Sequence, residues 1–557
     1  MPDPVLARIM AARDMTPADT VYRHADVFKP FTCEWERSDF AVKDGIIVGI
    51  GTEYRGIRER DLSGAYVIPG LIDAHMHIES SLLTPPEYAR LVARYGTTTV
   101  IADPHEIANV AGAKGIEYMV SGRAGAPVDL LYMLPSCVPA TPADIGGATL
   151  AAPDLAPFVG RDGVLGLGEM MNVPGVLAGD PGIRDKLMLM PIRDGHAPQL
   201  SGPYLNAYVL AGLQSDHECT GRAEALEKLR RGMYLFIREG STEQNIAELI
   251  SLVTPQTVSR CCFATDDCHA DLLAGGGHID RCIRRAVTCG LERELALRMA
   301  TLSAAERFGL HDRGALAPGR RADFCIVDDL EKFIVKQTFF GGKPSDTYVP
   351  TPLPAFPPTV ACTTPSPDMI RLESSGTARV IGIVPHQILT GSLRFTLTAT
   401  DIPDIKRDIL KVVVCNRYHP TDQCGVGLVH GFGFTHGAIA SSVSHDAHNI
   451  IAAGCSDEEI LAAMGAVIGA QGGMAAVDTG DVTLLPLDCA GLMSTLPSDK
   501  VVARLEKLHA VTRQMGSIAD PFMYLSFLAL TVVPSLRITD RGVFDGTVFC
   551  DVPLFED

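Results

Sequence analysis

Between about residues 67 and 308 of this 557-residue chain, short apolar segments alternate with helical stretches, as in repeated βα units. Apolar segments occupy residues 98–102, 130–134, 164–167, 187–190 and 234–237, and helical spacers occupy 86–95, 222–232 and 243–253. The eight predicted strands end near His77, Pro104, Cys137, Met171, His196, Glu218, Gly240 and Asp267. Eight units in roughly 240 residues predict a (β/α)8 barrel, whose active site lies at the C-terminal ends of the strands.

Both flanks of the predicted barrel have β character. The N-terminal flank contains two short strands joined by an Asp44-Gly45 turn. Residues 314–328 return to β character, and we expect them to pair with the N-terminal strands in one small sheet. The predicted division is 1–66 plus 309–349 for a small β-rich domain, 67–308 for the barrel, 350–367 for a Pro/Thr/Ser-rich linker and 368–557 for a C-terminal α/β domain. The predicted fold class is α/β.

Composition indicates which classes of partner and which cellular compartment to expect. A net charge of −18 disfavours nucleic acid or an anionic membrane as the main partner. The longest apolar stretch, near residues 524–536, is too short to span a bilayer, and the N-terminus lacks a signal-peptide pattern, so we expect a cytoplasmic protein. The 15 cysteines include no Cys-x-x-Cys pair and are interpreted as reduced thiols. We also expect a homo-oligomer, with a dimer favoured.

Titratable side chains gather where the predicted strands end. His75 and His77 close the first strand, and their imidazoles are expected side by side because residues i and i+2 of a strand share a face. The later strand ends add Asp103, His105, Glu106, Glu169, Asp194, His196, Asp216, His217, Glu218, Arg238, Glu239, Asp266 and Asp267. A barrel does not need these charges in order to fold, so their grouping predicts a site with chemistry.

Six of these residues are candidate ligands for two divalent metals: His75, His77, Glu169, His196, His217 and Asp266. Imidazole and carboxylate ligands suit Zn, Mn or Fe(II). Two such ions can share a bridging hydroxide that is available as a nucleophile near neutral pH. Only one of the adjacent Asp266 and Asp267 can point inward along a regular strand. We take Asp266, which comes first, as the ligand and as the proton-transfer group.

Longer motifs carry a family resemblance. The segment 69–77, the histidines of strands five and six and the aspartate of strand eight resemble the amidohydrolase superfamily. Segments 77–81, 103–107, 168–171, 194–196, 205–208, 237–241, 277–280 and 444–450 resemble the bacterial adenine deaminases within it, and the resemblance covers nearly the whole chain. It implies hydrolysis of adenine to hypoxanthine and ammonia with two metals, Mn or Fe(II) being expected. It also implies that Glu169 bridges them in place of the carboxylated lysine of several relatives.

The hypothesised mechanism begins with attack of the bridging hydroxide on C6 of the purine, and Asp266 transfers protons to N1 and to the departing ammonia. Candidates for holding the purine edges or moving protons are His105, Glu106, Arg238 and Glu239. A structural ion pair at the barrel mouth is the alternative for Arg238 and Glu239. Glu79 and Ser80 follow the first strand directly and are expected to bind substrate.

A second histidine cluster lies in the C-terminal domain, at His430, His436, His445 and His448. It can be interpreted as a loop closing over the barrel mouth, as another ion site or, most plainly, as structural histidines.

Two other functions are compatible with the barrel. One is an amidohydrolase acting on a cyclic amide or on a related 6-substituted purine, and the other is a non-catalytic relative. Glu169 argues against the lysine-bridged cyclic amidases. The complete ligand set argues against a non-catalytic protein.

Overall fold

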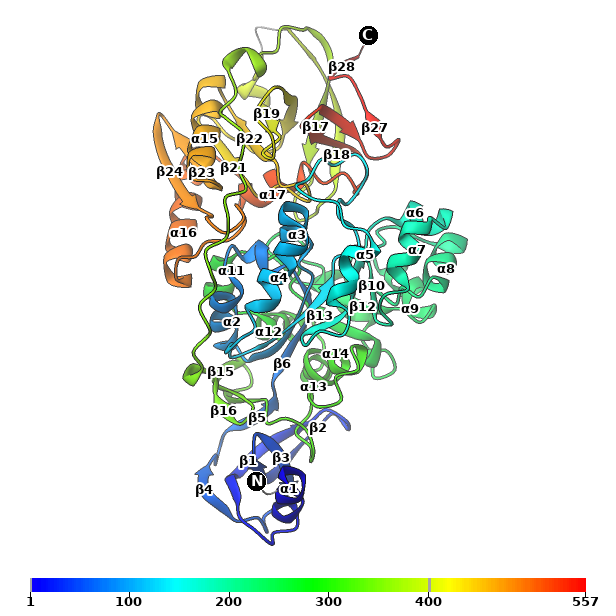
Figure 1. The fold of residues 1–557 in the computed structure, drawn as a ribbon, viewed down its shortest axis with the longest axis vertical. Coiled ribbons are helices and arrows are strands. Elements are labelled where there is room, and N and C mark those ends of the chain that lie inside the picture. The colour runs from blue at the N-terminus through cyan, green and yellow to red at the C-terminus, as the bar shows by residue number, and fades with distance from the viewer. Residues whose placement is uncertain (1–2, 399–401, 557) are drawn as a thin grey trace.

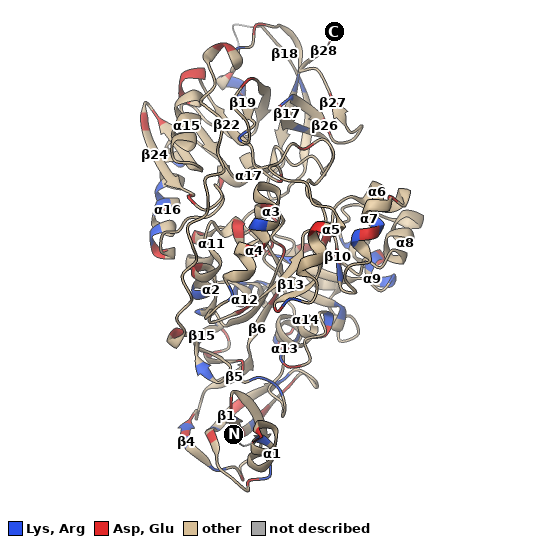
Figure 2. Cartoon of the chain, in the orientation of Figure 1, with Lys and Arg blue, Asp and Glu red and all other residues tan. Residues whose placement is uncertain are grey.

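The structure is a computed structural model that describes residues 3–398 and 402–556. A small sheet domain containing the N-terminus lies at one end of the elongated molecule, a helix-covered domain of parallel strands lies in the middle, and a C-terminal domain lies at the other end (Figure 1). Figure 2 shows acidic and basic segments interspersed along the outer helices α7 (Pro181–Leu187) and α16 (Ser498–Gln514). Among the described residues, no helix has both the length and the apolar character needed to cross a bilayer.

The small domain contains one eight-stranded sheet with strands from both flanks of the barrel. Its strands are β1 (Ala18–Lys29), β2 (Glu34–Lys43), β3 (Ile46–Ile50), β4 (Gly56–Asp61), β5 (Tyr66–Pro69), β14 (Phe324–Asp329), β15 (Ile334–Phe340) and β16 (Lys343–Pro344), and α1 (Pro4–Ala12) precedes them. The antiparallel pair β14–β5, which places Phe324 opposite Pro69, joins the two flanks as expected. Strand β5 carries this sheet to Pro69, beyond the expected limit at residue 66.

The middle domain contains eight strands in a TIM-barrel-like α/β arrangement. They are β6 (Leu71–Met76), β7 (Thr97–Ala102), β8 (Asp129–Leu134), β9 (Val164–Met170), β10 (Arg193–Gly195), β11 (Ser215–Asp216), β12 (Tyr234–Arg238) and β13 (Cys261–Ala264). Parallel pairing links β6 to β10 in one sheet and β11 to β13 in another. The two sheets meet at a parallel bridge between Met76, the last residue of β6, and Asp266, just beyond the end of β13.

Helices cover the outside of these strands. They are α2 (Pro85–Ala93), α3 (His105–Ala111), α4 (Ala113–Ser121), α5 (Ala152–Leu155), α6 (Val173–Ala178), α7, α8 (Gly202–Leu210), α9 (Arg222–Arg230), α10 (Ile246–Leu249), α11 (Ala270–Gly276), α12 (Ile279–Thr288), α13 (Arg293–Arg298) and α14 (Ala304–Arg307). The prediction of a strand over residues 187–190 was wrong, because that segment is the end of α7 and the turn after it. Ile183 and Leu187 are buried in α7 at the i, i+4 spacing of a helix face, and Met190 is buried just after the turn.

The C-terminal domain is built on a nine-stranded sheet. Its strands are β17 (Gly376–Ile383), β18 (Thr390–Leu397), β19 (Ile409–Cys415), β20 (Cys424–His430), β21 (Ala438–Ser441), β22 (Ile450–Gly454), β23 (Gly473–Asp478), β24 (Asp481–Pro486) and β28 (Phe555–Glu556). A small sheet of β25 (Leu536–Thr539), β26 (Gly542–Asp545) and β27 (Cys550–Asp551) and the helices α15 (Asp457–Gly469), α16 and α17 (Pro521–Phe527) complete it. Residues 350–366, within the expected linker, contain no helix or strand.

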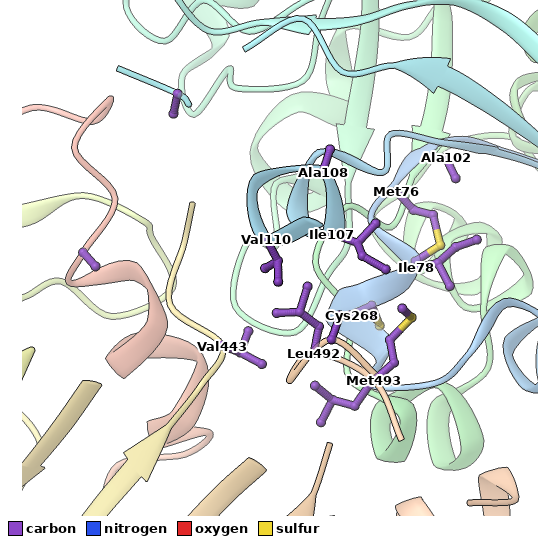
Figure 3. Close-up of a cluster of buried hydrophobic side chains, with 14 of the residues drawn as sticks. Met76, Ile78, Ala102, Ile107, Ala108, Val110, Cys268, Val443, Leu492 and Met493 are labelled. Carbon is purple, nitrogen blue, oxygen red and sulfur yellow. The ribbon is translucent and has the colours of Figure 1, made fainter. Parts of the chain in front are cut away.

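The barrel and the C-terminal domain share one hydrophobic core. Figure 3 shows Ile107 and Val110 of α3 near Leu492 and Met493, which precede α16, and all four side chains belong to a single buried cluster. The backbone N–H of Ser494 donates to Leu82 O over 2.8 Å at the same boundary. The C-terminal domain is therefore fixed against α3, the helix that begins with His105 and Glu106.

Candidate metal centre

Two buried histidines stand at the end of β6. The rings of His75 and His77 lie 4.9 Å apart at an interplanar angle of 86°. His77 Nδ1 contacts the backbone oxygen of Asp103 at 2.9 Å. A carbonyl only accepts, so Nδ1 carries the proton and Nε2 presents its lone pair. That nitrogen faces carboxylate oxygens of Glu169 and Asp266.

Glu169, near the end of β9, lies between two pairs of histidines. Its Oε1 is 3.8 Å from His75 Nε2 and 3.3 Å from His77 Nε2. Its Oε2 is 2.7 Å from His196 Nδ1 and 3.1 Å from His217 Nε2. Burial alone would raise the pKa of Glu169, but the imidazoles hold it well below its usual range. The carboxylate is thus ionised and offers one oxygen to each pair.

Asp266 completes the first histidine pair. Its Oδ1 lies 3.5 Å from His75 Nε2 and 3.2 Å from His77 Nε2. Its backbone N–H donates to His75 O over 3.0 Å, and its φ of 54° is in the left-handed region, which aspartate tolerates better than most residues. The neighbouring Asp267 turns elsewhere, because its Oδ1 accepts a short hydrogen bond from Ser80 Oγ. Of the two aspartates, Asp266 is therefore the one beside the histidines.

These residues fit a divalent metal centre. Three overlapping groups each bring three ligand atoms within 4.8 Å of one another: His75, His77 and Glu169; Glu169, His196 and His217; and His75, His217 and Asp266. All are buried, and His75 Nε2 has no hydrogen-bond partner among the described residues. Buried carboxylates and imidazoles in such numbers need positive charge and coordination to be stable. The donor set suits a cation that accepts nitrogen and oxygen ligands.

A second layer of contacts holds Glu169. Asp103 Oδ2 accepts from the Glu169 backbone N–H over 2.8 Å. Ser136 Oγ donates to the Glu169 carbonyl over 2.5 Å. Both ends of this peptide segment are thereby fixed, so the carboxylate has a defined position between the histidines.

Lys228 holds the loops that carry His196 and His217. Its buried Nζ donates to Ala197 O over 2.6 Å and to Asp216 Oδ2 over 3.0 Å. The other oxygen of Asp216 accepts from the Ala197 N–H over 2.8 Å. One ion pair inside the barrel wall therefore ties together the residues next to both histidines.

Asp73 supports the opposite side of the centre, below His75. Its Oδ1 accepts from the His75 N–H over 3.3 Å and from the Thr265 N–H over 3.2 Å. Its Oδ2 lies 2.9 Å from His278 Nε2. His278 belongs to the segment 277–280 that was noted in the sequence, and it acts here as a support for the ends of β6 and β13.

The C-terminal domain covers the space above these ligands. The cavity is lined on that side by Ile388, His445, Asp446, Phe527 and Leu530, and on the barrel side by ligand candidates and by His105, Glu106, Glu218, Arg238 and Asp267. The site thus lies at the C-terminal ends of the barrel strands but is completed by a different domain.

Comparison with known proteins agrees with this arrangement. Residues 66–345 match the amidohydrolase family, and residues 387–550 match the adenine deaminase C-terminal domain. The adenine deaminase of Methanoregula boonei is 69% identical over 548 residues, which is 98% of each chain. The adenine deaminase of Methanoculleus marisnigri is 62% identical over 521 residues, 93% of this chain and 100% of the relative. The chain belongs to the adenine deaminase family of amidohydrolases.

As in a metal-dependent amidohydrolase, the structure brings all six predicted ligands together. His105 and Glu106 also line the cavity. His105 lies beside the bridge candidate, with Nδ1 3.5 Å from Glu169 Oε1. Glu106 instead faces the C-terminal domain, since His445 Nδ1 lies 2.5 Å from its Oε1.

The other predicted substrate-binding residues are engaged with protein groups. Arg238 spans Glu218 and Asp266, so its guanidinium is used in a buried ion-pair network, which was the structural alternative for it. Glu79 Oε1 accepts from the Ile107 N–H over 3.1 Å, and burial beside Glu106 raises the pKa of Glu79 to about 7. Ser80 orients Asp267.

Glu239 does not join the cluster. It follows Arg238 at the end of β12, and its Oε1 lies 3.9 Å from Arg285 Nε instead of facing the histidines. Successive residues of a strand point to opposite faces, so Arg238 and Glu239 cannot both face inward. Of the two residues, Arg238 lines the cavity and belongs to a buried ion-pair network, whereas Glu239 is not among the residues that line the cavity.

Three residues at the site had no predicted role of their own: Asp103, Glu218 and Lys228. Asp103 and Glu218 stand at strand ends, and this position was the available signal for them. Lys228 lies inside helix α9, where a lysine ordinarily faces solvent, and the sequence carries no sign that it is buried. His445 belongs to the histidine cluster for which a loop over the barrel mouth, an ion site and a structural role were all left open, and its side chain lines the cavity.

Proposed function

We propose that this protein hydrolyses adenine to hypoxanthine and ammonia at a centre of two divalent metals. The ligands in this proposal are His75, His77, Glu169, His196, His217 and Asp266, with Glu169 as the bridge. The observation that carries it is the placement of the two Glu169 oxygens, one toward each histidine pair. The adenine deaminase relatives, which align with nearly the whole chain, give the substrate.

The metals, when bound, supply the Lewis acidity that makes water an effective nucleophile near neutral pH. The protein supplies orientation and proton transfer. In the overall reaction a C–O bond forms at C6 and the exocyclic C–N bond breaks. One proton of the water ends on N1, and the other leaves with the amine as ammonia.

Asp266 is the proposed proton carrier, because its Oδ1 faces the histidines while Arg238 occupies its Oδ2. His105, whose Nδ1 lies 3.5 Å from Glu169 Oε1, is the second group proposed to hold a proton or a purine edge. The cover formed by Phe527, Leu530 and Ile388 limits access of bulk water to the reacting atoms.

Several finer features belong to the same proposal. Mn or Fe(II) are the expected metals, with Zn also compatible with the ligand set. The two parallel sheets are proposed to close into a single (β/α)8 barrel over residues 67–308. The small flanking domain is proposed to occupy 1–66, extended by β5 to Pro69, plus 309–349. The C-terminal domain is proposed to occupy 368–557, with 350–367 as the linker. We also propose a homodimer that acts in the cytoplasm on a small purine.

The test is ammonia release by protein reconstituted separately with Mn, Fe(II) or Zn, using adenine, other 6-substituted purines, hydantoin and dihydrouracil. Turnover of adenine with two bound metals per chain is expected. Turnover only of a cyclic amide would replace this function with the alternative one.

A variant pair sharpens that test. Glu169→Gln is expected to lose bound metal and activity together, because an amide cannot serve both histidine pairs as an anion. Glu331→Gln, at an exposed position, is the matched control and should keep both. Normal metal content and turnover in Glu169→Gln would contradict the assigned bridge.

A further inference from the structure

His445 enters the cavity from the C-terminal domain, on the loop between β21 and β22. Its ring is buried and stacks on Phe527, with ring centroids 5.1 Å apart and an interplanar angle of 24°. Its backbone N–H donates to Ser526 Oγ over 3.3 Å. The imidazole is therefore held in one orientation by a helix of its own domain.

A carboxylate of the barrel fixes the proton on this ring. His445 Nδ1 lies 2.5 Å from Glu106 Oε1, and His448 Nε2 makes a short contact with Glu106 Oε2. The Glu106 carboxyl is ionised, because the neighbouring histidines hold its pKa well below the usual range although burial alone would raise it. An ionised carboxylate only accepts, so Nδ1 of His445 must donate.

The same three residues could also be read as a site for another metal, since their ligand atoms lie within 4.8 Å of one another. His448 argues against that reading. Its Nδ1 accepts from the Ser444 N–H over 3.2 Å, so its Nε2 carries the proton and has no lone pair for a cation. The cluster is thus a hydrogen-bonded support in which two imidazoles donate to one carboxylate.

This arrangement leaves the other nitrogen of His445 uncommitted. Its Nε2 has no hydrogen-bond partner among the described residues, although it is buried. The nearest acidic atom, Asp267 Oδ1, is 3.9 Å away, beyond hydrogen-bond range. A buried polar atom without a partner is costly, and here it lines the cavity that also contains the ligand candidates.

We propose that His445, protonated on both ring nitrogens, contacts the substrate directly, with its Nε2–H donating a hydrogen bond to an unprotonated ring nitrogen of the purine. Glu106 and His448 are positioning residues in this proposal, since they act through His445. The inference rests on the proposed adenine deamination and adds that the C-terminal domain contributes to substrate recognition. A site built to bond a ring nitrogen should reject a purine in which carbon replaces that nitrogen.

The experiment compares wild type with His445→Gln on adenine and on its 1-, 3- and 7-deaza analogues, with binding measured for any analogue that does not turn over. We expect kcat/KM for adenine to fall by about 10²-fold in the variant, with bound metal unchanged. Wild type should discriminate strongly against one deaza analogue, and His445→Gln should lose that discrimination. His436→Gln, a histidine of the same domain that pairs with Asp478 at 3.0 Å outside the cavity, should behave as wild type.

Other outcomes would overturn the inference. They are unchanged kinetics in His445→Gln, loss of a metal equivalent, or an equal loss on adenine and every analogue, as a purely structural role predicts. If His445→Gln does not fold, His445→Asn and Glu106→Asp replace it, and the latter should reproduce part of the same change in discrimination. Wild type that fails to deaminate adenine would refute the proposed function itself, whereas active wild type with an indifferent His445 variant would refute only this inference.

Discussion

Arg238 donates through Nη1 to Asp266 Oδ2 over 2.7 Å and thereby leaves Oδ1 of that carboxylate facing His75 and His77. The same guanidinium makes two contacts with Glu218, at 2.6 and 3.1 Å. One buried cation therefore sets the orientation of a proposed ligand. Its planar fork of donors is suited to this task, whereas the ammonium of lysine is a single point of charge.

Arg238→Lys is expected to keep the fold but to lower kcat/KM by roughly 10–100-fold, because one ammonium cannot hold both carboxylates in place. Steady-state kinetics with saturating metal, together with metal analysis, measures this. Arg313→Lys alters an arginine that contacts Asp129 at the start of β8, at the far end of the barrel, and should leave kcat/KM unchanged. Wild-type kinetics in Arg238→Lys would show that Asp266 needs no such orientation.

Lys228→Met is expected to lower the free energy of unfolding by about 3–5 kcal/mol, because it leaves Asp216 buried and unpaired. Lys186→Met is the matched control, since Lys186 is also buried but donates to a single backbone oxygen, that of Ser136, over 2.8 Å. Its loss should cost only about 1 kcal/mol. Urea unfolding followed by circular dichroism compares the two, and equal losses would argue that the Asp216 pair is not the cause.

Asp129→Asn is expected to destabilise the protein at neutral pH by about 3 kcal/mol without changing kcat. Burial alone would raise the pKa of Asp129, but Arg313, Arg321 and Arg123 hold it well below the usual range. A depressed pKa stabilises the fold above the unfolded value of about 3.9 and loses this effect as the pH falls below it. The stability difference between wild type and variant should therefore be constant from about pH 7 to 5 and shrink below about pH 4.

The control for that pH dependence is Asp162→Asn. Asp162 also pairs with Arg123, at 2.9 Å, but its side chain is 97% exposed. Its replacement should change stability by less than about 0.5 kcal/mol at any pH. A pH-independent difference between Asp129→Asn and wild type would contradict the role given to the arginines.

Removal of metal by a chelator is expected to lower the Tm, because a ligand that binds only the folded state stabilises it by an amount that grows with the logarithm of free ligand over Kd. Reconstitution should restore both Tm and activity at two equivalents per chain. Differential scanning calorimetry during a metal titration gives both readings on one sample. If the chelator abolished activity but left the Tm unchanged, metal binding would not stabilise the folded protein, and this prediction would be wrong.

The strand ends were predictable because polar and charged residues interrupt short apolar segments there, and all six ligand candidates follow that rule. The body of the fifth strand was not predictable, because the apolar run 187–190 is the end of α7 and the turn after it, whereas β10 is the short segment Arg193–Gly195. The face on which Glu239 lies follows from the alternation of side chains along the strand. A shift of one residue in the predicted register reverses that face.

The role of His445 could not be predicted from the spacing of residues in the sequence. It meets Glu106 across 339 positions of sequence, and only the packing of two domains brings them together. The sequence marks both segments as polar and family-like, but it does not say that they face each other.

The core shared by the barrel and the C-terminal domain has a consequence for recombining relatives. Helix α3 presents Ile107 and Val110 to Leu492 and Met493, and the same helix begins with Glu106, the partner of His445. A chimaera that joins the barrel of one homologue to the C-terminal half of another must therefore inherit both sides of this boundary from one parent. Otherwise poorly matched side chains at this boundary would tilt α3 and displace Glu106, and with it His445, from the site.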